Sequence, residues 1–227
     1  MKKTLALSLA TIISLGSFVP AFAASENLTI EEQVLVDDIE ITDDIKEEID
    51  ETLAAVCTYL NNETISLTQR ENKVYNIPVG EKIVTVTVKN EQLQNERNIG
   101  LDYYDVVANS SYKYTLTINN LYNGTGKIVF KLNYDTGDAV GTSGITASMY
   151  KLTITKATIS ATAPTNYDLY DSGTFINHDF DGSTAMRTTG YATFRKTFLP
   201  QVGFNLLVEG GTAGNDKVQI RYSYEVN

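Results

Sequence analysis

The sequence predicts an all-β protein, an antiparallel two-sheet β-sandwich of the Ig-like or jelly-roll kind, with an N-terminal α-helical segment. After residue 62, apolar and polar residues alternate with period two in many short segments, and turn residues separate these segments. Before residue 62, apolar residues recur at helical spacing instead. A sheet with one apolar face needs a second layer to cover it, which favours a sandwich.

The strongest β pattern lies in residues 111–134. Apolar residues occupy every even position in 112–118 and again in 128–134, with polar residues at most odd positions. Between them lies a connector that contains Asn123-Gly124, a typical hairpin turn pair. The pattern predicts a β-hairpin with one buried face, which needs the rest of the chain to cover it.

Several other segments are strand candidates because they alternate or are bounded by Gly and Pro. These are residues 65–70, 73–79, 83–89, 103–107, 145–161, 184–198, 202–208 and 218–226. In 145–161 the alternation slips by one near Lys156, which predicts a β-bulge or a bend between sheets. We expect residues 135–144 to form a Gly/Asp loop.

The chain begins with the features of a secretory signal peptide. Lys2 and Lys3 precede the apolar run Leu5–Val19, and Ala21-Phe22-Ala23 has the small-x-small pattern of a cleavage site. We therefore expect residues 1–23 to be removed and the protein to be secreted and extracellular. A retained membrane anchor is the alternative, although the apolar run is short for a span.

Residues 24–61 form an acidic amphipathic helical segment, and residues 62–227 form the predicted sandwich domain. Twelve Asp and Glu residues lie between residues 24 and 60 against Lys46 alone, whereas residues 61–227 are nearly neutral. Thr42 is a suitable N-cap for the helix. Its apolar stripe, which Cys57 borders, consists of Ile41, Ile45, Ile49, Leu53, Val56 and Leu60.

We expect this stripe to pack on the β-domain and the acidic face to lie in water. A docking helix for another protein and a cleavable or disordered leader are the alternatives. The chain has a net charge of -10 and a pI of about 4.6. Such a charge opposes binding to nucleic acid or anionic lipid, which depends on Lys and Arg. We expect no membrane span after signal cleavage.

Residues 177–183 are the best candidate for a metal site. Asn177, Asp179 and Asp181 match N-x-D-x-D-G, in which alternate oxygen side chains converge on Ca²⁺ and Gly182 permits a sharp turn. The twelfth position is Thr188 rather than Glu, and the alternative is a polar turn with Asx hydrogen bonds. Further oxygens are available from Asp168 and Asp171, and a weaker match lies at Asp135 and Asp138. Calcium is the one cofactor that the sequence suggests.

The residues that catalysis usually requires are scarce. His178 is the single histidine and Cys57 the single cysteine, which excludes a multi-histidine zinc site and an intrachain disulfide. No G-x-S-x-G motif or phosphate-binding glycine loop is present. We therefore expect no catalytic residues and no enzymatic activity.

Tyrosine is abundant, with 14 residues. Most lie on the apolar faces of predicted strands, where core packing is the expected role. Four tyrosines in loop-like contexts are better candidates for binding, because Tyr offers an amphipathic contact surface: Tyr103, Tyr104, Tyr167 and Tyr170.

These features predict a secreted, non-enzymatic β-sandwich that acts in extracellular or cell-surface interaction. Its partner would be a protein, a polysaccharide at the cell surface, or a second copy in a homo-oligomer, and sheet edges offer strand addition as a contact. A calcium-dependent carbohydrate- or cell-wall-binding module is the first alternative. A secreted hydrolase is the second.

Overall fold

The computed structural model describes residues 28–63, 65–67, 70–93, 108–140, 149–197, 199–212 and 218–227. The chain divides into two compact units, residues 1–38 and 39–227. Of the first unit, only the helical residues 28–38 are described. The second unit carries both sheets and the larger part of the helix.

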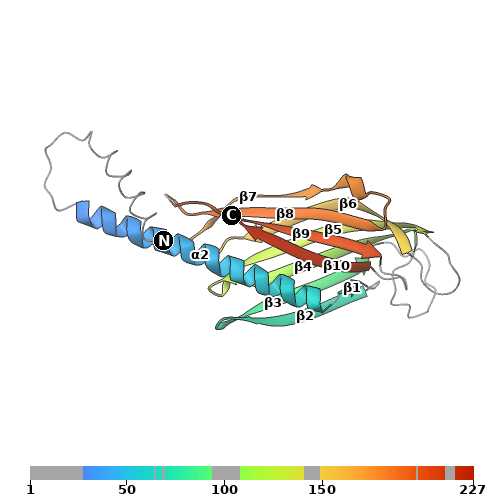
Figure 1. The fold of residues 1–227 in the computed structure, drawn as a ribbon, viewed down its shortest axis with the longest axis horizontal. Helices are drawn as coiled ribbons and strands as arrows, with labels where there is room; N and C mark the ends of the chain where they lie inside the picture. Colours follow the sequence, from blue (N-terminus) through green and yellow to red (C-terminus); the bar gives the residue numbers. More distant parts are fainter. Residues whose placement is uncertain are drawn as a thin grey trace. The chain divides into compact units, whose positions relative to one another are not determined.

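The predicted two-sheet antiparallel sandwich is confirmed (Figure 1). Each sheet has five strands. Sheet A has the order β1-β10-β9-β8-β7, with β1 Ser66–Leu67, β10 Val218–Val226, β9 Val202–Thr212, β8 Ala185–Arg195 and β7 Asp168–Ile176. Sheet B has the order β2-β3-β4-β5-β6, with β2 Arg70–Val79, β3 Lys82–Gln92, β4 Ser110–Tyr122, β5 Thr125–Val140 and β6 Met149–Thr162.

The strand order within each sheet follows the chain, apart from β1, which pairs with β10. Ig-like and jelly-roll sandwiches are built on Greek keys, in which a long connection returns a strand beside an earlier one. The described strands instead form a meander. The sandwich class is therefore as predicted, but neither expected topology is present, because neighbouring hairpins supply nearly all the pairing.

The hairpin of residues 111–134 is present as β4 and β5. Tyr112 lies opposite Tyr134 and Leu116 opposite Phe130, so the apolar positions of both strands share one face. Tyr122 pairs with Thr125 across a two-residue turn, in which Asn123 and Gly124 have φ of 47° and 74°. Positive φ at both central positions is the type I′ geometry that Asn-Gly favours.

The predicted bulge in the strand before Pro164 is also confirmed. Asn133 pairs with Lys156 and Tyr134 with Ile154, which leaves Thr155 as an extra residue in β6. The expected loop at 135–144 is wrong in its first part, because β5 continues to Val140 against β6. Strand 103–107 lies outside the described residues.

Strand β7 was not predicted from the sequence. Its residues alternate poorly, and a bulge between Leu169 and Asp171 interrupts the pairing with β8. It is an edge strand of sheet A, and none of its residues is buried. An edge strand has little need of an apolar face, so the period-two pattern is weak there.

The core lies between the sheets and is filled by the inward residues of both. The sheets approach each other closely at Gly190, where an added Cβ would lie 2.9 Å from the Phe130 ring and 3.0 Å from Ile159 Cδ1. A residue without a side chain therefore permits this approach. The largest fully buried side chains in the sandwich are Tyr112, Tyr114, Tyr134, Phe130, Phe194 and Phe204.

Helix α2 spans Leu28–Asn62 without a break. The expected N-cap at Thr42 is therefore wrong, since Thr42 lies inside the helix. Residues 28–41 contain no Gly or Pro and several Glu and Leu, so local propensity gives the helix no reason to stop.

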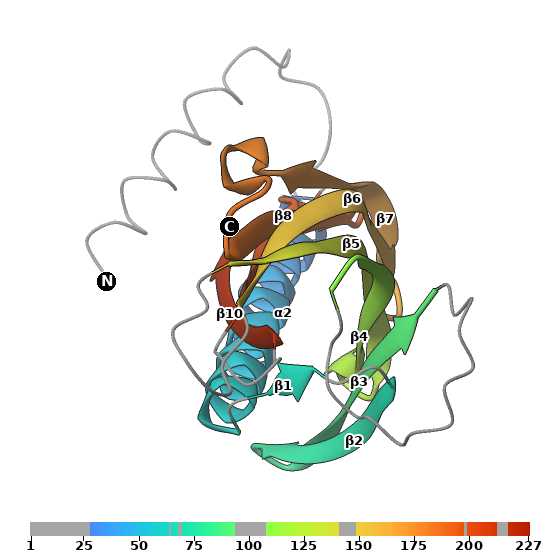
Figure 2. The ribbon, with the colours of Figure 1, turned by 90° about the vertical axis from the view of Figure 1, so that its right-hand side faces the viewer.

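The predicted packing of the apolar stripe is confirmed from Ile45 onward, while the side chain of Ile41 lies outside the described ones. The stripe residues from Ile45 to Leu60 are at most 1% exposed and belong to the same core cluster as the sheets. Tyr59 packs edge-on against Tyr75 of β2, and Thr52 Oγ1 donates to the Leu121 carbonyl of β4. The helix thus lies between β10 of sheet A and β2 of sheet B, which Figure 2 shows end-on.

Polar contacts hold the helix in this position. Glu48 Oε1 accepts from Lys82 Nζ at 2.5 Å and from the backbone N–H of Asn123 at 2.9 Å. These bonds join the helix to the start of β3 and to the β4–β5 turn.

Candidate interaction surfaces

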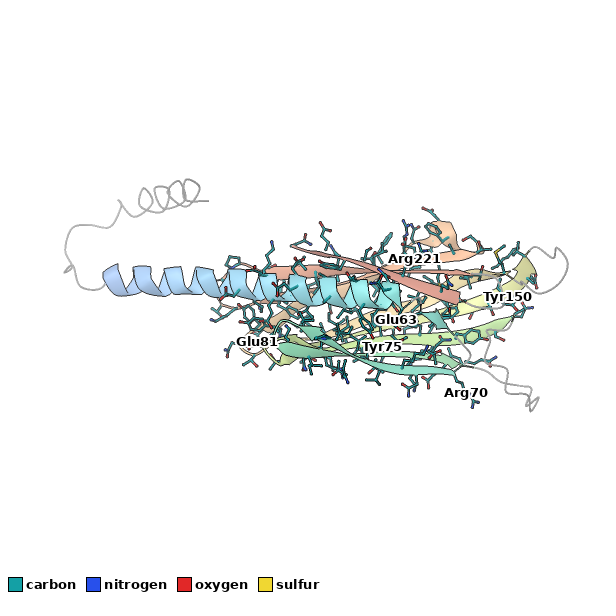
Figure 3. All side chains as sticks on the ribbon, turned by 60° about the horizontal axis from the view of Figure 1, so that its bottom comes forward. Glu63, Arg70, Tyr75, Glu81, Tyr150 and Arg221 are labelled. Carbon is teal, nitrogen blue, oxygen red and sulfur yellow. The ribbon has the colours of Figure 1, made fainter. Side chains whose placement is uncertain are left out.

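The outer face of sheet B is rich in lysine and threonine. Cross-strand pairing places Lys89, Thr115 and Lys131 in one row, because Thr115 pairs with both lysines. These outward positions alternate with buried ones along each strand. Four such rows of cross-strand partners, next to one another along the strands, have outward side chains. We call their cations the lysine face: Arg70, Lys89, Lys113, Lys127, Lys131 and Lys156. Figure 3 labels Arg70 at the start of β2.

The lysine face keeps most of its positive charge. Glu91 is the acidic residue of these rows, and its Oε1 lies 2.6 Å from Lys89 Nζ. Within the part of the chain that the structure describes, Lys113, Lys127 and Lys131 belong to no ion pair. The face therefore presents several uncompensated cations in a chain whose overall charge is negative.

The solvent side of α2 carries the opposite charge. Its exposed acids, which we call the acidic ridge, are Asp44, Glu47, Asp50 and Glu51, with Lys46 among them. The field of these acids reaches neighbouring strands. Burial, and then the charges of Glu48 and Asp44, raise the pKa of Tyr122, and burial followed by Asp50 raises the pKa of Tyr224.

The ridge and the lysine face lie on different sides of the same unit. The apolar stripe of α2 faces the core, so the ridge faces away from it. The lysine face is the outer side of sheet B, also directed away from the core. The two surfaces are therefore separated within one molecule and both are open to a partner.

Strand β7 adds exposed apolar side chains at the edge of sheet A. Phe175 is 68% exposed, Tyr170 is 52% exposed and Leu169 is 41% exposed. The Arg195 guanidinium lies 4.7 Å from the centre of the Tyr170 ring, a cation–π contact that covers part of it.

The four tyrosines proposed for binding have different positions. Tyr103 and Tyr104 lie outside the described residues. Tyr167 is buried at 8% exposure in the core cluster, whereas Tyr170 lies at the surface of β7. Burial of Tyr167 follows from its place just before β7, where the chain passes over the end of the sandwich core.

The predicted calcium loop is a tight turn with an Asx hydrogen bond. Asn177 precedes a short 3₁₀ helix, η2 (His178–Phe180), and its Oδ1 accepts from the Asp179 backbone N–H at 3.1 Å. The Asp181 carboxylate lies 2.8 Å from His178 Nδ1, and Gly182 has φ of 72°. Asn177 and Asp181 thus already use side-chain oxygens within the loop, as a polar turn requires.

Other carboxylates named for calcium lie elsewhere. Asp168 and Asp171 belong to β7 and Asp135 to β5, while Asp138 accepts from Asn109 Nδ2 at 3.4 Å. Among the described residues, no group of three or more His, Cys, Asp or Glu is arranged to hold a metal ion. Calcium binding through Asn177, Asp179 and Asp181 stays a prediction.

The single cysteine and the single histidine have unlike surroundings. Cys57 is buried on α2, and burial raises the pKa of its thiol to about 12, so the thiol stays protonated at neutral pH. The His178 side chain is exposed in the turn before β8. Cys57 is therefore a core residue, and its thiol is not an activated nucleophile.

Fold and surfaces define an all-β meander sandwich, with a helix between the edges of its sheets and two oppositely charged outer surfaces. Comparison of the chain with protein-family models, curated proteins and solved structures finds no match. In the described part of the chain, no helix has the length and apolar character needed to cross a membrane.

Sequence reasoning found the acidic helix but missed the lysine face. Its cations are spread over residues 70–156 and form no cluster in the sequence. The signal was nevertheless present, because Lys alternates with apolar residues in each strand and so had to lie outward. The sequence did not reveal the register of strand pairing that places these lysines side by side.

Proposed function

We propose that this protein is a secreted, non-enzymatic protein that self-associates outside the cell. In this proposal the acidic ridge of one copy binds the lysine face of the next. The observation that supports it is the placement of two strongly and oppositely charged surfaces on different sides of one compact unit. The signal-peptide pattern of residues 1–23 supports the extracellular setting.

Contact between two different surfaces has a consequence for the assembly. A ridge bound to a neighbour's lysine face leaves that neighbour's ridge free, so each added copy exposes a new binding surface. Such head-to-tail contacts close into rings or continue as open chains. The expected products are therefore rings or linear assemblies rather than a symmetric dimer.

The contact is expected to depend strongly on salt. An exposed ion pair contributes roughly 0.2–1 kcal/mol, so several pairs must act together. Charges at such a surface are screened over about 10 Å at 0.1 M salt. Complementary charge mainly speeds and orients the encounter, and the threonines between the lysines can add hydrogen bonds.

Reversal of charge on each surface in turn tests the proposal. One variant, Lys127→Glu/Lys131→Glu, makes the lysine face more acidic, and the other, Asp44→Lys/Glu47→Lys, makes the ridge basic. All four side chains are exposed, so the fold should persist. Light scattering at low salt should show assembly of the wild type and loss of assembly for each variant alone.

An equimolar mixture of the two variants is the decisive measurement. In the mixture, the unchanged acidic ridge of the lysine-face variant can bind the unchanged lysine face of the ridge variant, so mixing should restore association as one-to-one pairs. Arg195→Glu/Arg221→Glu is the matched control, because it changes the net charge as Lys127→Glu/Lys131→Glu does but lies on sheet A. A wild type that stays monomeric at low salt, or a mixture that fails to assemble, would remove the proposal. Loss of attachment to acidic polysaccharide in the lysine-face variant alone would favour a polysaccharide partner instead.

A further inference from the structure

The outer face of sheet A carries a depression that belongs to neither charged surface above. Its volume is about 310 Å³, and residues of β8, β9, β10 and the η2 turn line it. Its principal side chains are Phe180, Arg187, Glu209, Thr212, Gln219 and Arg221. Figure 3 labels Arg221 on β10.

Small residues create the hollow. Gly211 of β9 pairs with Ala185 of β8 on one side and with Gln219 of β10 on the other. A Cβ at Gly211 would meet no atom nearer than the Thr184 carbonyl oxygen at 3.8 Å. The space above Gly211 is thus open, and the floor of the depression is polar backbone.

The next row across the sheet is charged. Glu209 pairs in register with Arg187 on one side and with Arg221 on the other. Arg187 forms an ion pair with Glu209, and its guanidinium lies 5.0 Å from the centre of the Phe180 ring. The buried Nε of Arg187 has no hydrogen-bond partner among the residues that the structure describes. Arg221 is exposed and belongs to no ion pair among the described residues.

These groups make the depression a net positive site with hydrogen-bonding and aromatic walls. Two guanidinium groups face one carboxylate, so the depression has one positive charge that a bound anion can balance. Guanidinium groups bind carboxylates with two parallel hydrogen bonds. Gln219 and Thr212 can exchange hydrogen bonds with hydroxyl groups, and the Phe180 ring offers a surface for C–H groups.

We propose that this depression binds an acidic sugar, a pyranose that carries a carboxylate. Arg221 takes the carboxylate, Gln219 and Thr212 take ring hydroxyls, and Phe180 contacts the apolar side of the ring. The volume lies at the small end of the range for ligand pockets, about 300–1,000 Å³, which suits one sugar unit. The site is independent of self-association, because its residues lie outside both charged surfaces.

Titration with galacturonate, and with galactose as its neutral counterpart, tests this site by amide chemical-shift mapping. The two probes differ only at C6, where galacturonate carries a carboxylate and galactose a hydroxymethyl group. Galacturonate should shift amides of residues 209–212 and 219–221 at millimolar concentration, and galactose should bind at least tenfold more weakly. Arg221→Gln should weaken galacturonate binding about tenfold. Arg195→Gln is the matched control on the same face of sheet A and should leave it unchanged.

Gly211→Val gives a second test that keeps the fold intact. The φ of Gly211 lies outside the left-handed range and an added Cβ meets no atom nearer than 3.8 Å, so we expect the strand to accept valine, whose side chain fills the hollow. This variant should lose galacturonate binding and keep its melting temperature. Equal binding of galactose, equal loss in Arg195→Gln, or retained binding in Gly211→Val would overturn the proposal. Inorganic phosphate that competes fully at equal concentration would show a simple anion site and would also overturn it.

Discussion

The side chain of Asn61 pairs with the backbone of Tyr222 in both directions. Its Nδ2 donates to the Tyr222 carbonyl oxygen at 2.9 Å, and its Oδ1 accepts from the Tyr222 N–H at 2.9 Å. The amide thus takes the place of a neighbouring strand at this point of β10. Strand β1 pairs with Gln219 and Val218, and the carbonyl of Ile65 accepts from Ile220 N–H. Helix α2 therefore extends the protection of an exposed sheet edge.

We expect Asn61→Ala to lower the free energy of unfolding by about 1–3 kcal/mol, because two backbone groups of β10 lose their partners. Urea unfolding followed by circular dichroism measures this change. Asn62→Ala is the control, since Asn62 is the neighbouring residue and is exposed like Asn61. Equal effects of the two substitutions would show that the pairing with Tyr222 contributes nothing.

The helix stripe should contribute as core. Leu53 is fully buried in the shared cluster, so Leu53→Ala should cost about 2–5 kcal/mol. Glu51→Ala, on the exposed side of the same turn, should stay within about 0.5 kcal/mol of the wild type. Thermal unfolding observed at the aromatic residues of the sheets would detect the change. If the sheets melt at the same temperature in Leu53→Ala and Glu51→Ala, the helix and the sheets unfold separately.

Alkaline pH should destabilise the protein through its buried phenols. Tyr114 Oη and Tyr222 Oη lie 2.5 Å apart, and Tyr134 Oη donates to Asn90 Oδ1. Burial raises the pKa of all three tyrosines above the ordinary value of 10.0. The folded protein keeps these phenols protonated while the unfolded chain releases their protons. Stability is therefore complete below pH 10 and falls above it, by up to about 1.4 kcal/mol per pH unit for each phenol.

Ultraviolet titration of tyrosinate should show these three groups ionising only as the protein unfolds. Denaturant unfolding at a series of rising pH values gives the slope of the unfolding free energy against pH. Tyr134→Phe should reduce this slope by the contribution of one phenol. Unfolding free energy that does not change above pH 10 would contradict the assignment.

The Asn177 turn offers a test between a structural turn and a calcium site. We expect Asn177→Ala to cost about 1 kcal/mol, since it removes the Asx hydrogen bond to Asp179, with the same loss in EDTA and in Ca²⁺. The wild type and Asp179→Ala/Asp181→Ala are then compared by thermal melting with and without Ca²⁺. A rise in melting temperature with Ca²⁺ in the wild type alone would establish the metal site.

Much of the secondary structure followed from local pattern. The β4–β5 hairpin, its Asn-Gly turn and the bulge beside Lys156 were all predicted, because side-chain alternation and turn chemistry are local properties. Strand β7 was missed and the start of α2 was misplaced. An exposed edge strand carries little alternation, and no residue near Thr42 interrupts the helix.

By itself, the sequence determined which residues face inward, that the net charge lies almost entirely in one helix, and that two sheets are needed. Only the tertiary structure decided which strands are neighbours. Alternation tells which side of a strand is buried, but it does not tell which other strand lies beside it, because pairing depends on contacts between distant residues. The lysine face, the position of α2 between β10 and β2, and the depression around Gly211 all arise from that pairing.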